Sequence, residues 1–407
     1  MTILETLTRQ TKLLSGRIHA MAVEKRVIGA LRSSTPQQDD AVDFILFFAD
    51  GPGQRYQLEQ WLVPFESLAD RGYGVCVVVM NSLTAKFVAS STRLPILLSR
   101  SMETIESLLA SWGTSGIFYV NNSQANFTML RVSGPAHVHL SHGESEKSSM
   151  VSNQLKAYDF AFIAGEVARS RIINAIPRFD ATKLVEIGRP QLDVVANGSP
   201  PRLAESRVKV LYAPTWEGDG KNMDYSSIAR VGLKIVTALL SDERFTVIFR
   251  PHPKTGSWSA TARQELANIR KAISAASSKA PAAGHHIDQN DDSGLSILEA
   301  DIVICDISAI AMDAVGLDKP MLLLHSENTE ITKELAPSQT LLLKQAKDLL
   351  DHDNTRAFGD ELERLATAGV TSEQRSLQKR VFGSPALGHS TDRFIEAAAR
   401  VAGVRQR

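Results

Sequence analysis

The sequence has no surplus of either charge and almost no cysteine. Its 407 residues carry 45 basic and 45 acidic side chains, which removes any global electrostatic reason to bind nucleic acid, so local patches must carry any anion binding. Cys76 and Cys305 each lie in a strand-like apolar run, where a small buried thiol is the ordinary interpretation. This cysteine usage suits a reducing compartment.

Long apolar runs are missing as well. No stretch approaches the roughly 20 apolar residues that span a bilayer, and residues 1–34 lack the basic-then-apolar order of a secretion signal. We therefore expect a cytoplasmic protein. Residues 1–40 nevertheless predict an amphipathic helical segment, whose apolar stripe consists of Leu4, Leu7, Leu14, Ile18, Met21 and Ile28. Packing against its own domain or a second copy is the favoured role, and contact with the inner face of an anionic membrane is the alternative.

Several motifs of common enzymes are also absent. The sequence has no Gly-x-x-x-x-Gly-Lys-Ser/Thr loop, no Gly-x-Ser-x-Gly elbow and no Cys/His cluster with zinc spacing. Asp291 and Asp292 favour an exposed turn over a metal site. We therefore expect no bound metal, and we expect Arg, His, Lys and helix dipoles to neutralise any substrate charge.

What the sequence does contain is an alternation of short β-rich runs with amphipathic stretches. This alternation predicts the α/β class, with two doubly wound, Rossmann-like parallel-sheet domains facing a cleft. The expected strands are 43–48, 74–80, 116–120, 136–140, 160–163, 184–187, 208–212, 246–249, 302–304 and 321–324. The expected helices are 56–69, 102–111, 166–175, 228–240, 260–276 and 309–315.

A change of composition marks the boundary between these domains. The Asn-Gly-Ser-Pro-Pro-Arg segment cannot continue a helix or a central strand, so we predict a linker over residues 197–206. It separates a first domain (41–196) from a second domain (207–385), and residues 386–407 form a C-terminal helix that crosses back. Residues 278–284 are expected to form a flexible loop.

Ligands of open parallel sheets bind beyond the carboxyl ends of the strands, and four polar segments fall there. The first contains His142, which follows a strand and precedes Gly143, so its imidazole can act as a general base. A buried or capping histidine is the alternative. Lys147 adds a cation for an anionic substrate, or is an ordinary solvated lysine.

Two further segments belong to the second domain. The prolines of Arg-Pro-His-Pro restrict Arg250 and His252, and a fixed guanidinium and imidazole suit a phosphate. Arg250 as a structural ion-pair partner is the alternative. Thr215 and Trp216 follow another strand, where the hydroxyl suits a phosphate and the indole suits a base or ribose. Packing at a hinge is the alternative for Trp216.

The fourth segment joins a buried strand to a helix. The strand ends at Asp306, and Ser308 is placed as the N-cap of the next helix. A helix N-terminus at a strand end is a ready anion site, although Ser308 can also be a cap and nothing more. Asp313, one turn into the helix, is expected to face either the nucleotide or solvent.

Taken in order, these segments resemble the CDP-glycerol glycerophosphotransferase family, which builds teichoic-acid-type cell-wall polymers. The resemblance runs from about Ala136 to Arg393. The matching segments are His142 to Lys147 (family His-Gly-Thr-x-x-Lys), Gly188 to Asp193 (Gly-x-Pro-Arg-x-Asp), Tyr212 to Trp216 (Tyr-Ala-Pro-Thr-Trp), Arg250 to Pro253 (Arg-x-His-Pro), Asp306 to Ala309 (Asp-Tyr-Ser-Ser) with Asp313 beyond it, Lys319 with Pro320, and Gly388 to Arg393 (Gly-x-x-Ser-x-Arg).

The resemblance implies a fold and a set of site residues. The fold is the two-Rossmann GT-B type, with an acceptor-side first domain and the nucleotide on the second domain. His142 is then the base and His252 the second catalytic residue, which holds the donor diphosphate with Arg250 and Ser308. The implied substrate-binding set is completed by Gly143, Lys147, Thr215, Trp216, Asp306, Ala309 and Asp313. The chain departs from the family pattern at Glu144, Gln191, Ile307 and Ala309.

The resemblance also implies a reaction. Glycerol phosphate would pass from CDP-glycerol, a nucleotide-diphosphate donor, to a hydroxyl of a polymer or lipid-linked acceptor, with CMP leaving and no further cofactor. Ribitol phosphate is an alternative to glycerol phosphate. Two other functions stay open, namely a GT-B glycosyltransferase that uses a nucleotide-sugar, and a catalytically silent nucleotide-binding scaffold.

Overall fold

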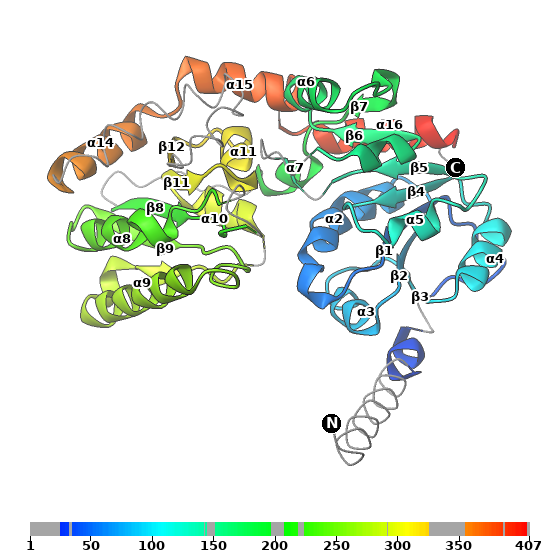
Figure 1. Cartoon of the computed structure of the whole chain (residues 1–407), viewed down its shortest axis with the longest axis horizontal. Coiled ribbons are helices and arrows are strands. Elements are labelled where there is room, and N and C mark those ends of the chain that lie inside the picture. Colours follow the sequence, from blue (N-terminus) through cyan, green and yellow to red (C-terminus); the bar gives the residue numbers. More distant parts are fainter. Residues whose placement is uncertain are drawn as a thin grey trace, which may run out of the picture.

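The structure is a computed structural model that describes residues 25–31, 35–141, 143–144, 151–196, 207–218, 224–290, 292–324, 355–385 and 387–404. Within these ranges two parallel β-sheets, each covered by helices, form two domains (Figure 1). The first sheet has seven strands in the order β3-β2-β1-β4-β5-β6-β7, and the second has five in the order β10-β9-β8-β11-β12. The predicted two-domain α/β class is confirmed. The predicted linker, 197–206, lies outside the described residues.

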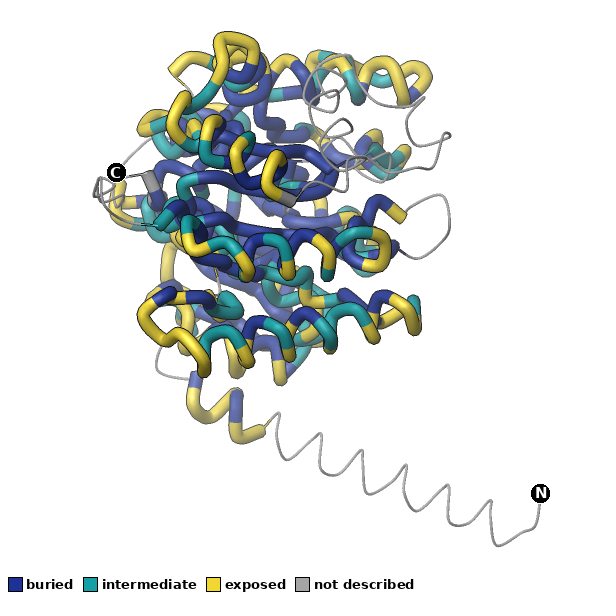
Figure 2. The backbone as a smooth tube through the Cα atoms, turned by 90° about the vertical axis from the view of Figure 1, so that its left-hand side faces the viewer, coloured by how far each residue is buried: buried dark blue, intermediate teal, exposed yellow. Residues whose placement is uncertain are grey.

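The strands of the first domain are nearly continuous apolar runs. They are β1 (Phe44–Phe48), β2 (Val75–Val79), β3 (Ile96–Leu98), β4 (Gly116–Tyr119), β5 (Ala136–His139), β6 (Phe160–Ile163) and β7 (Leu184–Glu186). The helices are η1 (Pro52–Gln54), α2 (Tyr56–Asp70), α3 (Ser82–Val88), α4 (Met102–Trp112), α5 (Asn126–Met129), η3 (Asn153–Ala157), α6 (Glu166–Ala175), η4 (Ala181–Lys183) and α7 (Pro190–Ala196). Figure 2 shows the buried strands between helices whose exposed sides face outwards, as expected of a parallel sheet.

The second domain repeats this arrangement. Its strands are β8 (Val208–Ala213), β9 (Phe245–Phe249), β10 (His286–Ile287), β11 (Ile302–Asp306) and β12 (Met321–Leu324). Its helices are η6 (Ile228–Gly232), α8 (Leu233–Leu240), α9 (Ala260–Lys279), η7 (Pro281–Ala283), α10 (Ser293–Glu299), α11 (Ala309–Gly316) and α14 (Thr355–Ala368). Every predicted strand of the chain is present, with ends within two residues of those expected.

Two segments of the second domain that the sequence predicts as a loop and a turn precede β10 and α10. The flexible loop expected at 278–284 is wrong, because α9 extends to Lys279 and a short 3-10 helix follows directly. Asp292 is exposed as expected, but it is the N-cap of α10 with extended backbone and not a turn. Its carboxylate accepts a hydrogen bond from the N–H of Gly294 (2.8 Å). Asp291 lies outside the described residues.

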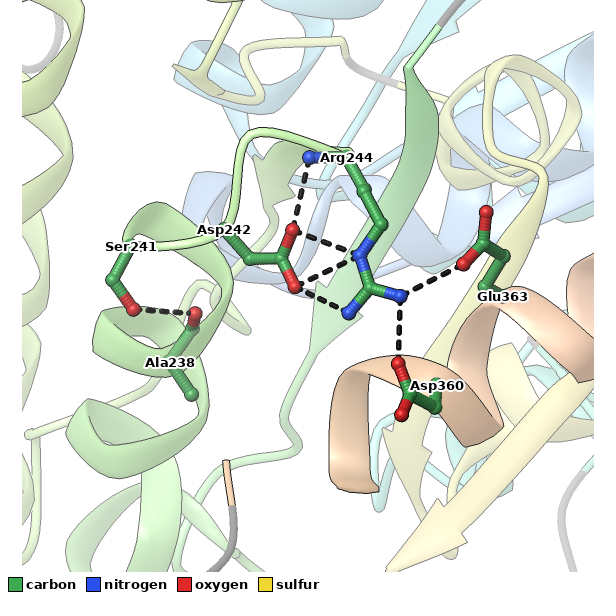
Figure 3. A network of polar contacts seen from close by, with 6 residues as sticks. All are labelled: Ala238, Ser241, Asp242, Arg244, Asp360 and Glu363. Carbon is green, nitrogen blue, oxygen red and sulfur yellow. Dashed lines mark hydrogen bonds and ion pairs between the residues drawn. The ribbon is translucent and has the colours of Figure 1, made fainter. Parts of the chain in front are cut away.

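A charged network holds α14 against the second domain. The guanidinium of Arg244 lies between Asp242 (2.6 Å) on its own loop and Asp360 and Glu363 of α14 (both 2.8 Å), as Figure 3 shows. The apolar side of α14 contributes Leu362 to the core of this domain. Since the network is partly exposed, burial of the apolar side provides most of the stabilisation.

The last two helices return the chain to the first domain (Figure 1). Leu377 and Phe382 of α15 (Ser372–Phe382) share one buried apolar cluster with Val167 of α6 and Val315 of α11, so this cluster spans both domains. The following helix, α16 (Ser390–Ala402), inserts Phe394 into the core of the first domain. The domains are therefore joined by a packed interface as well as by the chain.

Two of the segments that resemble family motifs bind each other near this crossing. Gly188 has a φ of +74°, and a Cβ atom there would lie 2.2 Å from the guanidinium of Arg393, so only glycine fits. The carboxylate of Asp193 accepts hydrogen bonds from the backbone N–H groups of Gly388 and Thr391 (both 2.7 Å). These contacts fix the start of α16 to α7 and to the turn that follows β7.

The part of the N-terminal helix that the structure describes, residues 25–31, packs on the first domain. Residues 25–31 are helical, and Val27 and Leu31 belong to the apolar core of that domain. Ile28, which the sequence placed on the apolar stripe, is 44% exposed, so this residue does not pack on its own domain. The other stripe residues lie outside the described residues, and the choice between packing and membrane contact stays open there.

The two cysteines lie inside strands of the two sheets. Cys76 in β2 and Cys305 in β11 are free and fully buried, as expected of small apolar residues. Over the part of the chain that the structure describes, no helix is long and apolar enough to cross a membrane.

Phe394 provides a test of how α16 packs on the first domain. The centroid of its ring lies 5.5 Å from that of Trp61, 5.2 Å from that of Phe65 and 6.3 Å from that of Phe118. We expect Phe394→Ala to lower the free energy of unfolding by about 3–5 kcal/mol because it leaves a cavity. Denaturant unfolding measures this change. The exposed Glu396→Ala on the same helix is the control, with an expected change under about 0.5 kcal/mol. A loss below about 1 kcal/mol for Phe394→Ala would contradict the account.

Candidate functional site

A cleft of about 1330 Å³ lies between the two domains, and both contribute to its walls. Its residues follow the carboxyl ends of parallel strands, for example Asn121 after β4, His252 after β9 and Ser308 after β11. Such strand ends are where this class of fold binds ligands. Of the residues that the sequence singles out, the cleft is lined by Gly143, Thr215, Trp216, Arg250, His252, Ser308, Ala309 and Asp313.

The N-terminus of α11 borders the cleft. Ser308 occupies the N-cap position, but its hydroxyl donates to the carbonyl oxygen of Asp306 (3.0 Å) and makes no capping bond to the helix. The first-turn N–H groups that a serine cap would normally satisfy are thus left without a side-chain partner. With the helix dipole, such N–H groups suit an anion, so the start of α11 beside Ser308 and Ala309 is a candidate anion site.

Arg250 is both fixed and at the cleft. Its guanidinium forms an ion pair with Asp288 (2.6 Å) and donates to the carbonyl oxygen of Asn290 (2.8 Å) and the hydroxyl of Ser296 (3.2 Å). Burial alone would raise the pKa of the Asp288 carboxyl, but hydrogen bonds from Ser296, Asn290 and Arg250 together lower it. The carboxylate therefore stays charged and holds the guanidinium in place. The ion-pair alternative for Arg250 is observed, and the side chain also lines the cleft.

His252 is oriented by its neighbours. Its ring stacks on the indole of Trp216 (6.0 Å between centroids, 21° between planes), and the ammonium of Lys254 lies 4.8 Å from the same indole. The backbone N–H of Lys254 donates to Nδ1 of His252 (3.1 Å). A neutral His252 therefore carries its proton on Nε2 and can donate it. Trp216 thus packs against the loop after β9 and also lines the cleft, and neither its predicted contact with a base or ribose nor the hinge alternative is tested.

Glu217, which the sequence did not single out, fixes the loop that carries His252. Its carboxylate accepts hydrogen bonds from the N–H groups of Gly256 (3.1 Å), Trp258 (2.8 Å) and Ser259 (2.9 Å). Burial would raise the pKa of this carboxyl, but these backbone hydrogen bonds lower it overall. A charged Glu217 therefore ties the loop after β8 to the loop after β9.

Asp306 does not line the cleft, contrary to its expected role in donor binding. The side chain is fully buried, and Oδ2 accepts hydrogen bonds from the N–H groups of Thr215 (2.8 Å) and Ser227 (3.1 Å). Asp306 is the last residue of β11, and these two hydrogen bonds hold its side chain beneath the loop after β8. Burial raises the pKa of Asp306 to about 6, against the lowering effect of these hydrogen bonds. Asp306 positions Thr215 and does not reach a ligand in the cleft.

A buried ion pair connects the domains at the edge of the cleft. Arg189, in the turn after β7, donates through Nε to Oδ1 of Asp313 (2.6 Å) and through Nη2 to Oδ2 (3.1 Å). The two side chains are only 8% and 5% exposed. Burial works to lower the pKa of Arg189, but Asp313 raises it overall, so the guanidinium stays charged. Asp313 was expected to face nucleotide or solvent, whereas its carboxylate is bound to Arg189.

The first-domain wall contains a polar network. Nδ2 of Asn121 donates to Asp50 (2.7 Å) and Gln57 (2.9 Å), and the hydroxyl of Ser123 donates to Asp50 (2.9 Å). All four residues line the cleft. None of the four was predicted from the sequence, although Asp50 and Asn121 follow β1 and β4, and their place at strand ends is a signal for ligand binding.

The comparisons with known proteins agree with this geometry. A family model described as CDP-Glycerol:Poly(glycerophosphate) glycerophosphotransferase matches residues 86–333, more than half of the 407 residues. The chain belongs to this family. It is a CDP-glycerol glycerophosphotransferase-like enzyme, as the sequence motifs predicted. No curated protein matches the chain at a significant level.

Solved structures show the same fold. The wall teichoic acid polymerase TagF superposes with a TM-score of 0.54 at 14% identity, over 99% of each chain. MnaA of S. aureus, in a co-structure with UDP, superposes with a TM-score of 0.51 at 12% identity, over 90% of this chain and 98% of MnaA. At these identities the likeness shows the fold alone, and it confirms the GT-B type for this glycerophosphotransferase-family chain.

Two predicted site residues of this family member, His142 and Lys147, lie outside the described residues, so their predicted roles stay predictions. Gly143 is described and lines the cleft. Next to it, Glu144 forms an ion pair with Arg171 of α6 and is 8% exposed. Among the described residues, no group of three or more His, Cys, Asp or Glu side chains is arranged to hold a metal ion.

The raised pKa of Asp306 predicts a pH-dependent stability. Because it is raised from 3.8 to about 6, the folded chain binds the proton more tightly than the unfolded chain does. The charged carboxylate therefore destabilises the fold above about pH 6, and this penalty disappears below about pH 4. Asp306→Asn removes the titration. The free energy of unfolding of the variant relative to the native chain should rise by up to about 3 kcal/mol between pH 4 and pH 7.

Chemical denaturation at several pH values measures this difference. Asp39→Asn, at an exposed position, serves as the control for the loss of one carboxylate. A stability difference for Asp306→Asn that does not change over this pH range would refute the role of burial.

Proposed function

We propose that the protein transfers glycerol phosphate, or a related alditol phosphate, from a CDP-activated donor to a hydroxyl group of a surface-polymer or lipid-linked acceptor, with release of CMP. The carrying observation is the interdomain cleft, where the N-terminus of α11, Arg250 and His252 converge from the second domain. Membership of the glycerophosphotransferase family supports the reaction class. An asparagine-for-histidine variant of TagF was soaked with CDPG, which supports the choice of a CDP-activated donor.

In this proposal the donor diphosphate binds to the second domain. The N–H groups at the start of α11 receive phosphate oxygens beside Ser308 and Ala309, and His252 donates from Nε2. Arg250 contributes a fixed positive charge. In this proposal these groups alone bind the diphosphate. The reaction requires no cofactor besides the donor substrate.

The proposed transfer is an in-line displacement. The acceptor oxygen forms a bond to the β-phosphorus, and the bond from that phosphorus to the oxygen bridging it to the α-phosphorus breaks. CMP leaves with the bonding electron pair, and the proton of the acceptor hydroxyl passes to His142, the proposed base. Contact with the inner face of the membrane and association with a second copy stay predictions.

The first test is product analysis with a panel of CDP-alditols and nucleotide-sugars. We expect CMP and a new phosphodiester from a CDP-alditol, identified by mass spectrometry. We expect His142→Ala to lower kcat by about two to four orders of magnitude while CDP binding is retained. His286→Ala, in β10 and outside the cleft, is the control. A new glycosidic bond would instead identify a glycosyltransferase, and no turnover with any donor would favour a silent scaffold.

The second test concerns Arg250. Arg250→Ala should weaken CDP binding about 10- to 100-fold, since hydrogen bonds to charged groups contribute about 1.5–3 kcal/mol. Calorimetry with CDP measures the affinity. Ser296→Ala is the matched control, because it disturbs the network around Asp288 but keeps the guanidinium. Equal weakening by both variants would show that Arg250 acts only through that network, and unchanged affinity of Arg250→Ala would exclude it.

A further inference from the structure

A second, smaller cavity adjoins the cleft on the side of the first domain. This side cavity has a volume of about 50 Å³. Gly143, Arg189 and Gln191 line both the cleft and the side cavity, so the two spaces meet at these residues. Trp61, Glu144 and Arg171 contribute to its remaining wall. None of the functional assignments above uses this cavity.

Two residues of the side cavity's wall, Gln191 and Arg171, carry buried polar atoms that have no partner. Both amide atoms of Gln191, and Nε and Nη1 of Arg171, are shielded from solvent without a hydrogen bond. The ion pair of Arg171 with Glu144 uses only Nη2. An unsatisfied buried polar group costs about 1–3 kcal/mol, and native proteins keep few of them. Four such atoms on two residues of one wall carry a cost that a polar group in the side cavity removes when the two side chains turn towards it.

The chemistry of these atoms favours a hydroxyl group. Whichever way the amide of Gln191 is turned, it presents one donor and one acceptor, whereas Arg171 presents donors only. A hydroxyl can donate to the amide oxygen and accept from the guanidinium at the same time. A fully ionised phosphate cannot use the amide oxygen, and both guanidinium groups here already have carboxylate partners, Glu144 for Arg171 and Asp313 for Arg189.

Size and position restrict the occupant further. A water molecule needs about 10–15 Å³ of cavity volume. With about 50 Å³, the side cavity holds roughly three or four groups of that size, such as the end of a polyol. A Cβ atom placed on Gly143 would lie 3.4 Å from Cβ of Ala309 at the start of α11. The mouth of the side cavity therefore lies next to the proposed diphosphate site, and Ser141 and Gly143, the chain neighbours of His142, line it.

We propose that the side cavity binds the hydroxyl-bearing end of the acceptor, and that Gln191 and Arg171 recognise its polyol. This inference rests on the proposed transfer to an acceptor hydroxyl and adds the acceptor subsite. One hydroxyl donates to the amide oxygen of Gln191 and accepts from the guanidinium of Arg171, and the amide nitrogen of Gln191 donates to a second oxygen. An end group of a polyol-phosphate chain is the occupant that fits.

The test separates acceptor from donor in steady-state kinetics, with CDP-glycerol as donor and a short soluble poly(glycerol phosphate) as acceptor. Gln191→Leu should raise the KM for the acceptor about 10-fold or more, and leave the KM for CDP-glycerol and the Kd for CDP within twofold. Gln154→Leu is the matched control, because Gln154 also has a buried unpartnered amide oxygen but lines neither space. An unchanged acceptor KM, or an equal rise in both KM values, would overturn the proposal.

Arg171→Lys provides a second variant if Gln191→Leu fails to fold. It keeps a positive charge for Glu144 but removes the guanidinium donors, so we expect the same selective rise in the acceptor KM. Unchanged acceptor KM in this variant would count against the subsite.

A binding measurement separates this inference from the proposed reaction. We expect glycerol 3-phosphate, titrated into the native chain saturated with CDP, to bind and to lose at least 10-fold in affinity in Gln191→Leu. Such binding without any turnover of CDP-glycerol would support the side cavity and reject the proposed donor. Turnover with the same probe affinity in both proteins would reject the side cavity and leave a water-filled space as its explanation.

Discussion

The buried ion pair between Arg189 and Asp313 is the contact on which the geometry of the cleft depends. It joins the turn after β7 in the first domain to α11 in the second, with both side chains nearly excluded from solvent. Loss of either partner would leave an uncompensated buried charge, at a cost of about 3–5 kcal/mol. The apolar cluster around Phe382 of α15 packs beside it. Together they hold the start of α11 against Gly143, so the side cavity and the proposed diphosphate site face each other across a short distance.

The two walls of the cleft differ in chemistry. The second domain supplies positive charge and N–H donors through Arg250, His252 and the start of α11, and buried carboxylates such as Asp288 and Glu217 fix the loops that carry them. The first domain supplies mainly neutral hydrogen-bonding groups, among them Asn121 and the amide of Gln191. This division suits an ionic nucleotide on one side and a polyol on the other. A phosphotransferase needs both, since it mainly positions its partners and neutralises developing charge.

The sequence predicted the sheets well because apolar strands buried on both faces leave a pattern that one segment alone reveals. The strand-end rule likewise found Thr215, Arg250 and Ser308 in the cleft. The direction of a side chain at a strand end was harder, because it depends on which distant segment packs there. Asp306 turned inwards because backbone N–H groups of Thr215 and Ser227 meet it, and Asp313 turned to Arg189, 124 positions away. Local pattern carries no information about such partners. For the same reason Arg171 did not stand out, and Gln191 stood out only as a departure from the family pattern.

A structure of the chain with CDP bound would show whether the second domain holds the donor diphosphate at the start of α11. We expect phosphate oxygens within hydrogen-bonding distance of the backbone N–H groups at Ser308 and Ala309 and of Nε2 of His252. A diphosphate seated instead against Asp50 and Asn121 on the first-domain wall would contradict this expectation.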